Sequence, residues 1–228
     1  MTFSAQKMNV PTIGNNLPRL GNAFSRALGR LVLGIGGWRF EGAPPDEPKF
    51  VTINAPHTSN WDAVWVISVL LAMGLKIHWM AKHTLFQNPL RRLLFWLGGV
   101  PIDRTKSHGV VDQMVDEFQK RDKFVIGITP EGTRKRVPTW KTGFYFMAMS
   151  AHVPIVMAFM DYHRKVLGFG PVLNPSGALA ADMKQFETFY AGITGKNPEN
   201  YNPAIFRQEK SGNGDRIAQT GSTDKLQT

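Results

Sequence analysis

Residues 49–65 read KFVTINAPHTSNWDAVW, and this stretch decides the fold. Its first part, 49–55, is rich in β-branched residues and predicts a strand. The apolar segment 61–75 that follows predicts a helix. His57 and Asp62 stand where the strand has ended and the helix is about to begin, which is the place where open α/β sheets form their ligand crevices. The stretch therefore predicts a strand–turn–helix unit with polar side chains at the carboxyl end of the strand.

The same alternation continues toward the C-terminus. Further strands are predicted at 77–81, 124–128 and 154–159, and further helices at 89–97, 110–121 and 141–151. Strands that alternate with helices predict an α/β fold, with a central, mostly parallel sheet flanked by helices. We expect one such domain at 45–206, after an N-terminal segment at 1–44. The end of the chain, 207–228, is dominated by Gly, Ser, Gln, Thr and charged residues and predicts a disordered tail.

An amphipathic helix is predicted at 17–38. Its apolar residues recur at spacings of three and four, and arginines fall between them: Leu20, Phe24, Ala27, Leu28, Leu31 and Ile35, with Arg19, Arg26 and Arg30. Such a helix either packs on the protein core or lies in a membrane interface with its arginines at anionic headgroups. The arginine pattern favours the membrane interface.

Composition narrows the classes of protein that fit. The chain has 228 residues, 43% of them hydrophobic, which is enough for a globular core, and it has no cysteine, which excludes disulfides and thiolate catalysis. The net charge of +10 is concentrated at 76–145, where 13 Lys and Arg face 6 Asp and Glu. The longest apolar candidate, 64–75, has 12 residues, whereas a spanning helix needs about 20. No secretory signal is evident at the start, so any membrane contact is expected to be peripheral.

His57 and Asp62 are the candidate catalytic pair. Five residues apart, they cannot share one face of a helix, so His57 must precede the helix. If Ser59 or Asn60 is the N-cap, Asp62 falls in the first turn and His57 can fold back to hydrogen-bond with it. The pair would then be a general base with its orienting carboxylate. The alternative is structural, because Ser59 and Asp62 also form a variant of the capping box that a helix needs here.

Two other polar clusters are predicted at strand ends, GVPIDR at 99–104 and TPEGTR at 129–134. Gly132 would allow close backbone approach to a ligand, and Arg104 and Arg134 offer the forked donors that suit a phosphate. The alternative is a pair of turns with solvated arginines. Because a glutamate lies inside this basic stretch, bulk neutralisation of nucleic-acid phosphates is a poor fit.

The four segments HTSNWD, GGVPIDR, TPEGTR and VPIV occur in this order between 54 and 156. Together they resemble the four blocks of the glycerolipid acyltransferase family, whose bacterial representatives acylate 1-acyl-glycerol-3-phosphate and carry an HX4D motif. The resemblance implies transfer of a fatty acyl group from acyl-CoA or acyl carrier protein to the free hydroxyl of a lysophospholipid. It implies no cofactor besides that acyl donor. It also implies a peripheral protein on the anionic, cytoplasmic face of the inner membrane, active in phospholipid biosynthesis.

The resemblance also implies roles for individual residues. His57 would deprotonate the acceptor hydroxyl and Asp62 would orient it, while Pro154 would shape the pocket wall. The acceptor's phosphate and glycerol would be bound by a larger set: Lys82, Arg104, Glu131, Gly132, Thr133 and Arg134.

This chain departs from the family pattern at two positions. Pro56 stands where an asparagine is common before the histidine, and Thr129 stands where an aromatic residue is common before the third block. The second departure lies at the expected acceptor pocket, so another lysophospholipid or a lyso-aminolipid remains an alternative acceptor.

Two further readings compete with acyl transfer. One is a metal-dependent hydrolase that uses His57, His78, His83 and His108, although their spacing matches no common ligand motif, so we predict no metal. The other is a non-enzymatic basic module that binds membranes.

Overall fold

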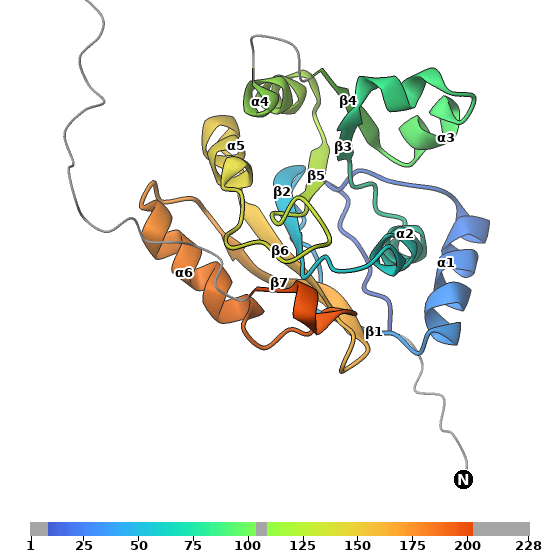
Figure 1. The fold of residues 1–228 in the computed structure, drawn as a ribbon. Coiled ribbons are helices and arrows are strands. Elements are labelled where there is room, and N and C mark those ends of the chain that lie inside the picture. The colour runs from blue at the N-terminus through green and yellow to red at the C-terminus, as the bar shows by residue number, and fades with distance from the viewer. Residues whose placement is uncertain (1–8, 104–108, 203–228) are drawn as a thin grey trace, which may run out of the picture.

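The computed structural model describes residues 9–103 and 109–202. Within them, helices and strands alternate along much of the chain (Figure 1). The helices are α1 Ala23–Ile35, α2 Trp61–Met73, α3 Arg91–Trp96, α4 Val110–Lys120, α5 Gly143–Ala151 and α6 Leu179–Tyr190. The strands are β1 Arg39–Glu41, β2 Lys49–Ala55, β3 Trp79–Lys82, β4 Gly99–Ile102, β5 Phe124–Ile128, β6 Ile155–Asp161 and β7 Val166–Leu173. Two 3₁₀ turns, η1 His83–Gln87 and η2 Pro198–Asn200, complete the set.

The central sheet has the strand order β1-β7-β6-β2-β5. β2 pairs in parallel with β5 on one side and β6 on the other, and β1 pairs in parallel with β7. Only the β6–β7 pair is antiparallel among the described strands. A small parallel pair, β3–β4, continues this surface through a bridge between His78 and Ile126. The predicted α/β class with a mostly parallel sheet is confirmed.

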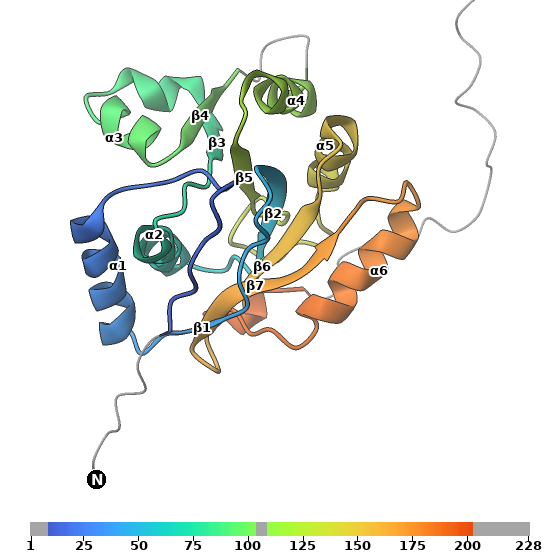
Figure 2. The same cartoon turned by 180° about the vertical axis from the view of Figure 1, so that it is seen from behind.

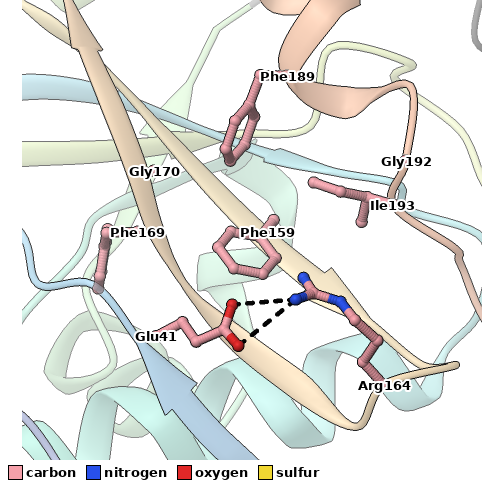
Figure 3. Close-up of a pocket in the computed structure, with 8 residues that line it drawn as sticks. All are labelled: Glu41, Phe159, Arg164, Phe169, Gly170, Phe189, Gly192 and Ile193. Carbon is pink, nitrogen blue, oxygen red and sulfur yellow. Dashed lines mark hydrogen bonds and ion pairs between the residues drawn. The ribbon is translucent and has the colours of Figure 1, made fainter.

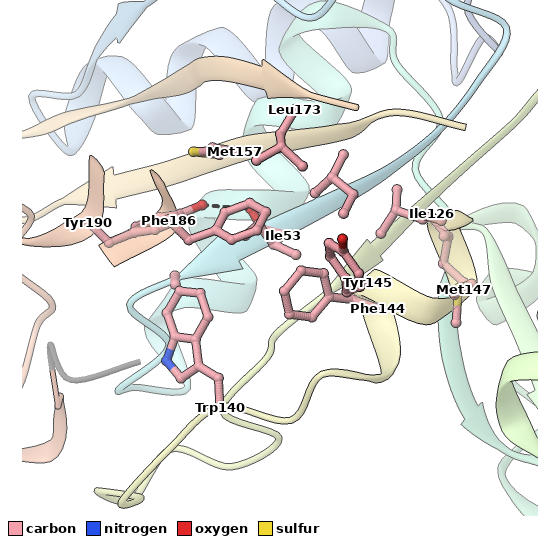
Figure 4. Close-up of a cluster of buried hydrophobic side chains, with 14 of the residues drawn as sticks. Ile53, Ile126, Trp140, Phe144, Tyr145, Met147, Met157, Leu173, Phe186 and Tyr190 are labelled. Carbon is pink, nitrogen blue, oxygen red and sulfur yellow. Dashed lines mark hydrogen bonds between the residues drawn. The ribbon is translucent and has the colours of Figure 1, made fainter. Parts of the chain in front are cut away.

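Helices cover both faces of the sheet (Figures 1 and 2). α1 and α2 lie side by side on one face, while α4, α5 and α6 lie on the other. The second face carries the larger buried cluster, in which aromatic side chains of α5 and α6 pack against β2, β5 and β6 (Figure 4). Tyr190 of α6 also donates its hydroxyl toward the carbonyl oxygens of Ile53 and Ala158 in the two central strands. This packing holds β2, and so the turn that follows it, in a rigid frame.

Several predicted boundaries were wrong. The N-terminal helix spans 23–35 rather than 17–38, because Gly21 has a positive φ of 70° and Asn22 caps the helix by accepting a hydrogen bond from the Ser25 amide. The strand predicted at 77–81 is β3, shifted to 79–82. The helices predicted at 61–75, 89–97 and 141–151 are each shorter.

The elements beyond 161 were not predicted at all. β7 contains two glycines and a proline, which weaken the strand signal, yet its pairing with β1 and β6 makes it a strand. Residue 104 and the predicted tail from 207 lie outside the described residues. In the part of the chain that the structure describes, no helix is long and apolar enough to cross a membrane.

Candidate active site

The candidate site lies at the carboxyl ends of β2 and β5. These strands are neighbours, with Ile53 paired with Ile128. The chain leaves β2 at Ala55 and reaches His57 two residues later, and it leaves β5 at Ile128 and reaches Glu131 three residues later. Because parallel strands end at the same edge, the two turns meet: the backbone N–H of His57 donates to Oε1 of Glu131 at 3.0 Å.

His57 and Asp62 are in direct contact. The imidazole Nδ1 lies 3.0 Å from Asp62 Oδ2, with the histidine side chain 21% exposed and the aspartate side chain 6% exposed. Since a carboxylate only accepts, it selects the tautomer that carries the proton on Nδ1, which leaves the Nε2 lone pair free to accept a proton. This arrangement is that of a general base with an orienting carboxylate.

Asp62 also performs the structural role that the sequence offered as an alternative. Its Oδ2 accepts the backbone N–H groups of Thr58 and Ser59, each at 2.9 Å, at the start of α2. Asn60, the N-cap, makes no side-chain cap bond. One carboxylate oxygen thus caps the turn and orients His57, so the capping and catalytic interpretations are compatible.

The electrostatics of Asp62 favour its ionised form. Burial by itself raises the pKa of this carboxyl, but hydrogen bonds from His57, Tyr162 and the Ser59 backbone outweigh it, and the net pKa lies below the ordinary value. A charged carboxylate therefore faces the imidazole at neutral pH.

Glu131 shows the opposite behaviour. It is 5% exposed, burial raises its pKa above the ordinary value, and its Oε2 has no hydrogen-bond partner among the described residues. The backbone bond from His57 partly offsets this effect. Glu131 was expected to contact the acceptor, and its Oε1 is already used to hold the backbone of the candidate base.

The other predicted binding residues lie around this turn. Gly132 has φ of +66°, a backbone conformation that favours glycine, and a Cβ there would lie 3.0 Å from Nζ of the flexible Lys141 side chain. Thr133 and Arg134 are exposed on the same turn, and Lys82 is exposed at the end of β3. Arg104 lies outside the described residues.

Two contacts came from residues that the sequence did not single out. Tyr162 donates its hydroxyl to Oδ1 of Asp62 at 2.6 Å. Asn197 donates its backbone N–H to Thr58 Oγ1 at 3.1 Å and its side-chain amide to the Thr58 carbonyl at 2.8 Å. These residues are 100 and 139 positions away from their partners, and no local pattern marks them.

A separate surface pocket of about 340 Å³ lies beside the β6–β7 ribbon (Figure 3). Phe159, Phe189 and Ile193 line it together with an ion pair between Arg164 and Glu41. Arg164 also pairs with Asp161 at 2.7 Å, so its charge is already compensated. None of the residues predicted for the site lines this pocket.

The described residues contain no cluster of histidine and acidic side chains with the geometry of a metal site. His78, one of the four histidines considered as ligands, is buried, with its Nδ1 3.0 Å from the Val125 carbonyl oxygen. Burial lowers the pKa of His78 to about 4, which fits a structural histidine.

Comparison with known proteins points to one family. The model of the Acyltransferase family matches residues 41–160, more than half of the chain. The 1-acyl-sn-glycerol-3-phosphate acyltransferase of Escherichia coli (strain K12) is 35% identical over 109 residues, which cover 45% of this chain and 43% of that protein. The matched region is thus less than half of that enzyme's length.

A solved structure supports the fold. The crystal structure of the 1-acyl-sn-glycerophosphate (LPA) acyltransferase PlsC from Thermotoga maritima superposes with a TM-score of 0.51, at 15% identity, over 75% of this chain and 77% of that one. The matched region 41–160 contains His57, Asp62 and Glu131. The chain therefore belongs to the acyltransferase family.

Proposed function

We propose that this protein moves a fatty acyl group from an acyl thioester, acyl-CoA or acyl carrier protein, to the free hydroxyl of a lysophospholipid, with 1-acyl-glycerol-3-phosphate as the acceptor and phosphatidic acid as the product. The observation that carries the proposal is the contact between His57 Nδ1 and Asp62 in the strand-end turn, in a chain of the acyltransferase family.

The proposed reaction uses that geometry. The Nε2 lone pair of His57 accepts the proton of the acceptor hydroxyl while the hydroxyl oxygen attacks the thioester carbonyl carbon. The tetrahedral adduct collapses, the carbon–sulfur bond breaks, and the departing sulfur takes the proton from the imidazolium. Asp62 stabilises the imidazolium between these two steps. The acyl group passes directly between the substrates, with no acyl-enzyme.

The acceptor's phosphate would be bound by cations around the turn after β5. Arg134 is exposed there, two residues after Gly132, whose backbone has a positive φ of 66°. Lys82, from the end of β3, and Arg104 complete the proposed set. A phosphate monoester needs several fixed donors to offset its desolvation. If the site takes a different lysolipid, the feature that would explain this preference is Thr129, which stands where the family commonly has an aromatic residue.

Membrane association is proposed through α1. Phe24 and Ile35 are 76% and 80% exposed, and Leu28 and Leu31 on the same face are exposed as well. The opposite face packs on α2, where a Cβ on Gly29 would lie 2.5 Å from backbone atoms of α2. Residues 1–40 contain no Asp or Glu, so α1 itself carries only neutral and cationic side chains. This combination fits the interface of an anionic membrane.

The neighbouring helix α3 extends that surface. Leu90, Leu93, Phe95 and Trp96 are exposed beside Arg91 and Arg92. Trp96 lies close to Gly21, just before α1, and both views place the two helices on the same side of the molecule (Figures 1 and 2). We place the protein as a peripheral enzyme on the cytoplasmic face of the inner membrane.

The decisive experiment is an acylation assay with purified protein. Each of a panel of lyso-acceptors is paired with acyl-CoA and with acyl carrier protein thioesters, and products are identified by mass spectrometry. The wild type should acylate 1-acyl-glycerol-3-phosphate, and His57→Ala should lose about 10² to 10⁴ in turnover with an unchanged melting temperature. A His57→Ala variant that keeps a third of the activity would rule out the assigned base.

A further inference from the structure

Tyr162 lies directly after β6, just beyond the region 41–160 that matches the acyltransferase family. Its hydroxyl donates to Oδ1 of Asp62 at 2.6 Å. The other oxygen, Oδ2, contacts the His57 ring and accepts two backbone N–H groups. Each carboxylate oxygen therefore has its own partners, and Tyr162 is the partner on the side away from His57.

Tyr162 is itself held in place by packing. Its ring meets Trp38 edge to face, with centroids 5.0 Å apart and an interplanar angle of 83°. Trp38 in turn packs against Trp65, with ring centroids 5.5 Å apart. The backbone N–H of Tyr162 donates to the Thr194 carbonyl at 2.9 Å. The ring and the backbone of Tyr162 are thus held by two separate segments of the chain, and its hydroxyl is directed at Asp62.

The segment 194–197 connects this residue to the turn of the candidate base. Thr194 accepts from Tyr162, and Asn197 makes two hydrogen bonds to Thr58, the residue after His57. A Cβ on Gly195 would lie 2.8 Å from Thr58 Oγ1, so this segment packs tightly against the turn. Tyr162 and the turn are held by the same few residues.

We propose that Tyr162 is a positioning residue that sets the orientation and hydrogen-bond strength of Asp62 and, through it, the basicity of His57. The inference rests on the proposed function, because it assigns Tyr162 a part in general-base catalysis. It assigns a role to a residue outside all four sequence blocks.

Loss of the Tyr162 hydroxyl should change the pKa of His57 in one direction. The Tyr162 hydroxyl draws charge from the Asp62 carboxylate, so its removal leaves a more basic carboxylate facing His57, which raises the pKa of the imidazole. Burial and the adjacent carboxylate raise the pKa of Tyr162 itself, so the hydroxyl stays a donor across the working pH range. Glu131, a further titratable side chain that interacts electrostatically with His57 and Asp62, is unchanged by this substitution.

The test compares two tyrosines. Tyr162→Phe removes the hydroxyl and keeps the ring that packs on Trp38. Tyr145→Phe is the matched control, because Tyr145 donates to another buried carboxylate, Asp182, at 2.7 Å. Within the described residues, Tyr145 makes no hydrogen bond to His57 or Asp62. In Tyr162→Phe we expect kcat to fall about tenfold, as for a hydrogen bond to a charged group. The acid limb of the kcat/KM profile should move up by about half a pH unit or more. Tyr145→Phe should leave that limb in place.

A second measurement does not depend on acyl transfer. The pKa of the His57 imidazole is followed by NMR, with the His57→Ala spectrum identifying its signal. It should rise in Tyr162→Phe, and it should fall when 3-fluorotyrosine, a stronger donor, replaces Tyr162. The proposal is overturned if the His57 pKa is the same in all these proteins, or if Tyr162→Phe and Tyr145→Phe lose equal activity with no shift of the acid limb. A shifted His57 pKa in a protein that acylates no lysolipid would support the positioning role and reject the proposed reaction.

Discussion

Replacing Asp62 with asparagine isolates the electrostatic part of the proposed mechanism. The amide oxygen can still accept the backbone N–H groups of Thr58 and Ser59, so the turn should keep its conformation. The charge that faces the imidazolium is lost. At 3.0 Å and an effective dielectric constant of about 20, that attraction is worth about 5 kcal/mol. Because proton transfer is incomplete in the transition state, we expect a loss of about 3 to 4 kcal/mol, or about 10² to 10³ in kcat.

The assay is steady-state acylation of 1-acyl-glycerol-3-phosphate at saturating donor, with thermal melting measured in parallel. Asp182→Asn is the matched control, because Asp182 is equally buried, accepts a tyrosine hydroxyl and accepts the Ser176 backbone N–H. Asp62→Asn should lower kcat with little change in KM, whereas Asp182→Asn should affect melting more than turnover. An Asp62→Asn enzyme that retains kcat within threefold of the wild type, or an equal loss of activity in both variants, would refute an electrostatic role for Asp62.

The other predictions concern stability, the acceptor and the membrane. Burial raises the pKa of Glu131, so the ionised carboxylate lowers the free energy of unfolding. This destabilisation is absent below the pKa that Glu131 has in the unfolded chain, and it develops as the pH rises through the higher pKa that Glu131 has in the folded protein. Glu131→Gln should therefore raise the melting temperature at pH 7 to 8 and change it little near pH 4, and a uniform shift at all pH values would contradict this. Arg134→Ala should raise KM for 1-acyl-glycerol-3-phosphate far more than KM for the thioester. Lysophosphatidylcholine is the comparison acceptor, and an unchanged order of preference between the two acceptors would show that Arg134 does not recognise the headgroup. Replacing both Phe24 and Ile35 with serine should reduce the fraction of protein that sediments with anionic vesicles. Replacing Val172 with serine should not, because Val172 is exposed on β7, away from α1. Equal vesicle binding by the wild type and both variants would show that the α1 face does not bind the membrane.

The structure also changes how the membrane prediction should be tested. Deletion of residues 1–37 is the obvious truncation, but Leu17 and Leu33 are fully buried and belong to the core on the α1–α2 side. Such a deletion would unfold part of the protein, because loss of a buried leucine alone costs about 2 to 5 kcal/mol. Substitutions on the exposed face avoid this confusion.

The elements predicted with correct ends are those whose signal is local and strong. β2 at 49–55 and β5 at 124–128 each contain three β-branched residues and a run of buried side chains, and both boundaries agree with the structure. β7 and α6 escaped prediction because pairing and packing, rather than local composition, stabilise them: β7 is held between β1 and β6, and α6 buries Phe186 and Tyr190 in the core. Tertiary contacts override weak local preferences in such cases.

The sequence by itself determined the α/β class and the contact between His57 and Asp62, because both follow from short-range geometry: a strand that ends, a helix that begins, and five residues between them. Only the tertiary structure decided that Glu131 holds the His57 backbone and that Tyr162 completes the partners of Asp62, since these residues are 74 and 100 positions away. It also decided which face of α1 is covered. The buried face is marked by Gly29, whose missing side chain lets the two helices approach, and hydrophobic periodicity cannot detect a contact made by the absence of a side chain.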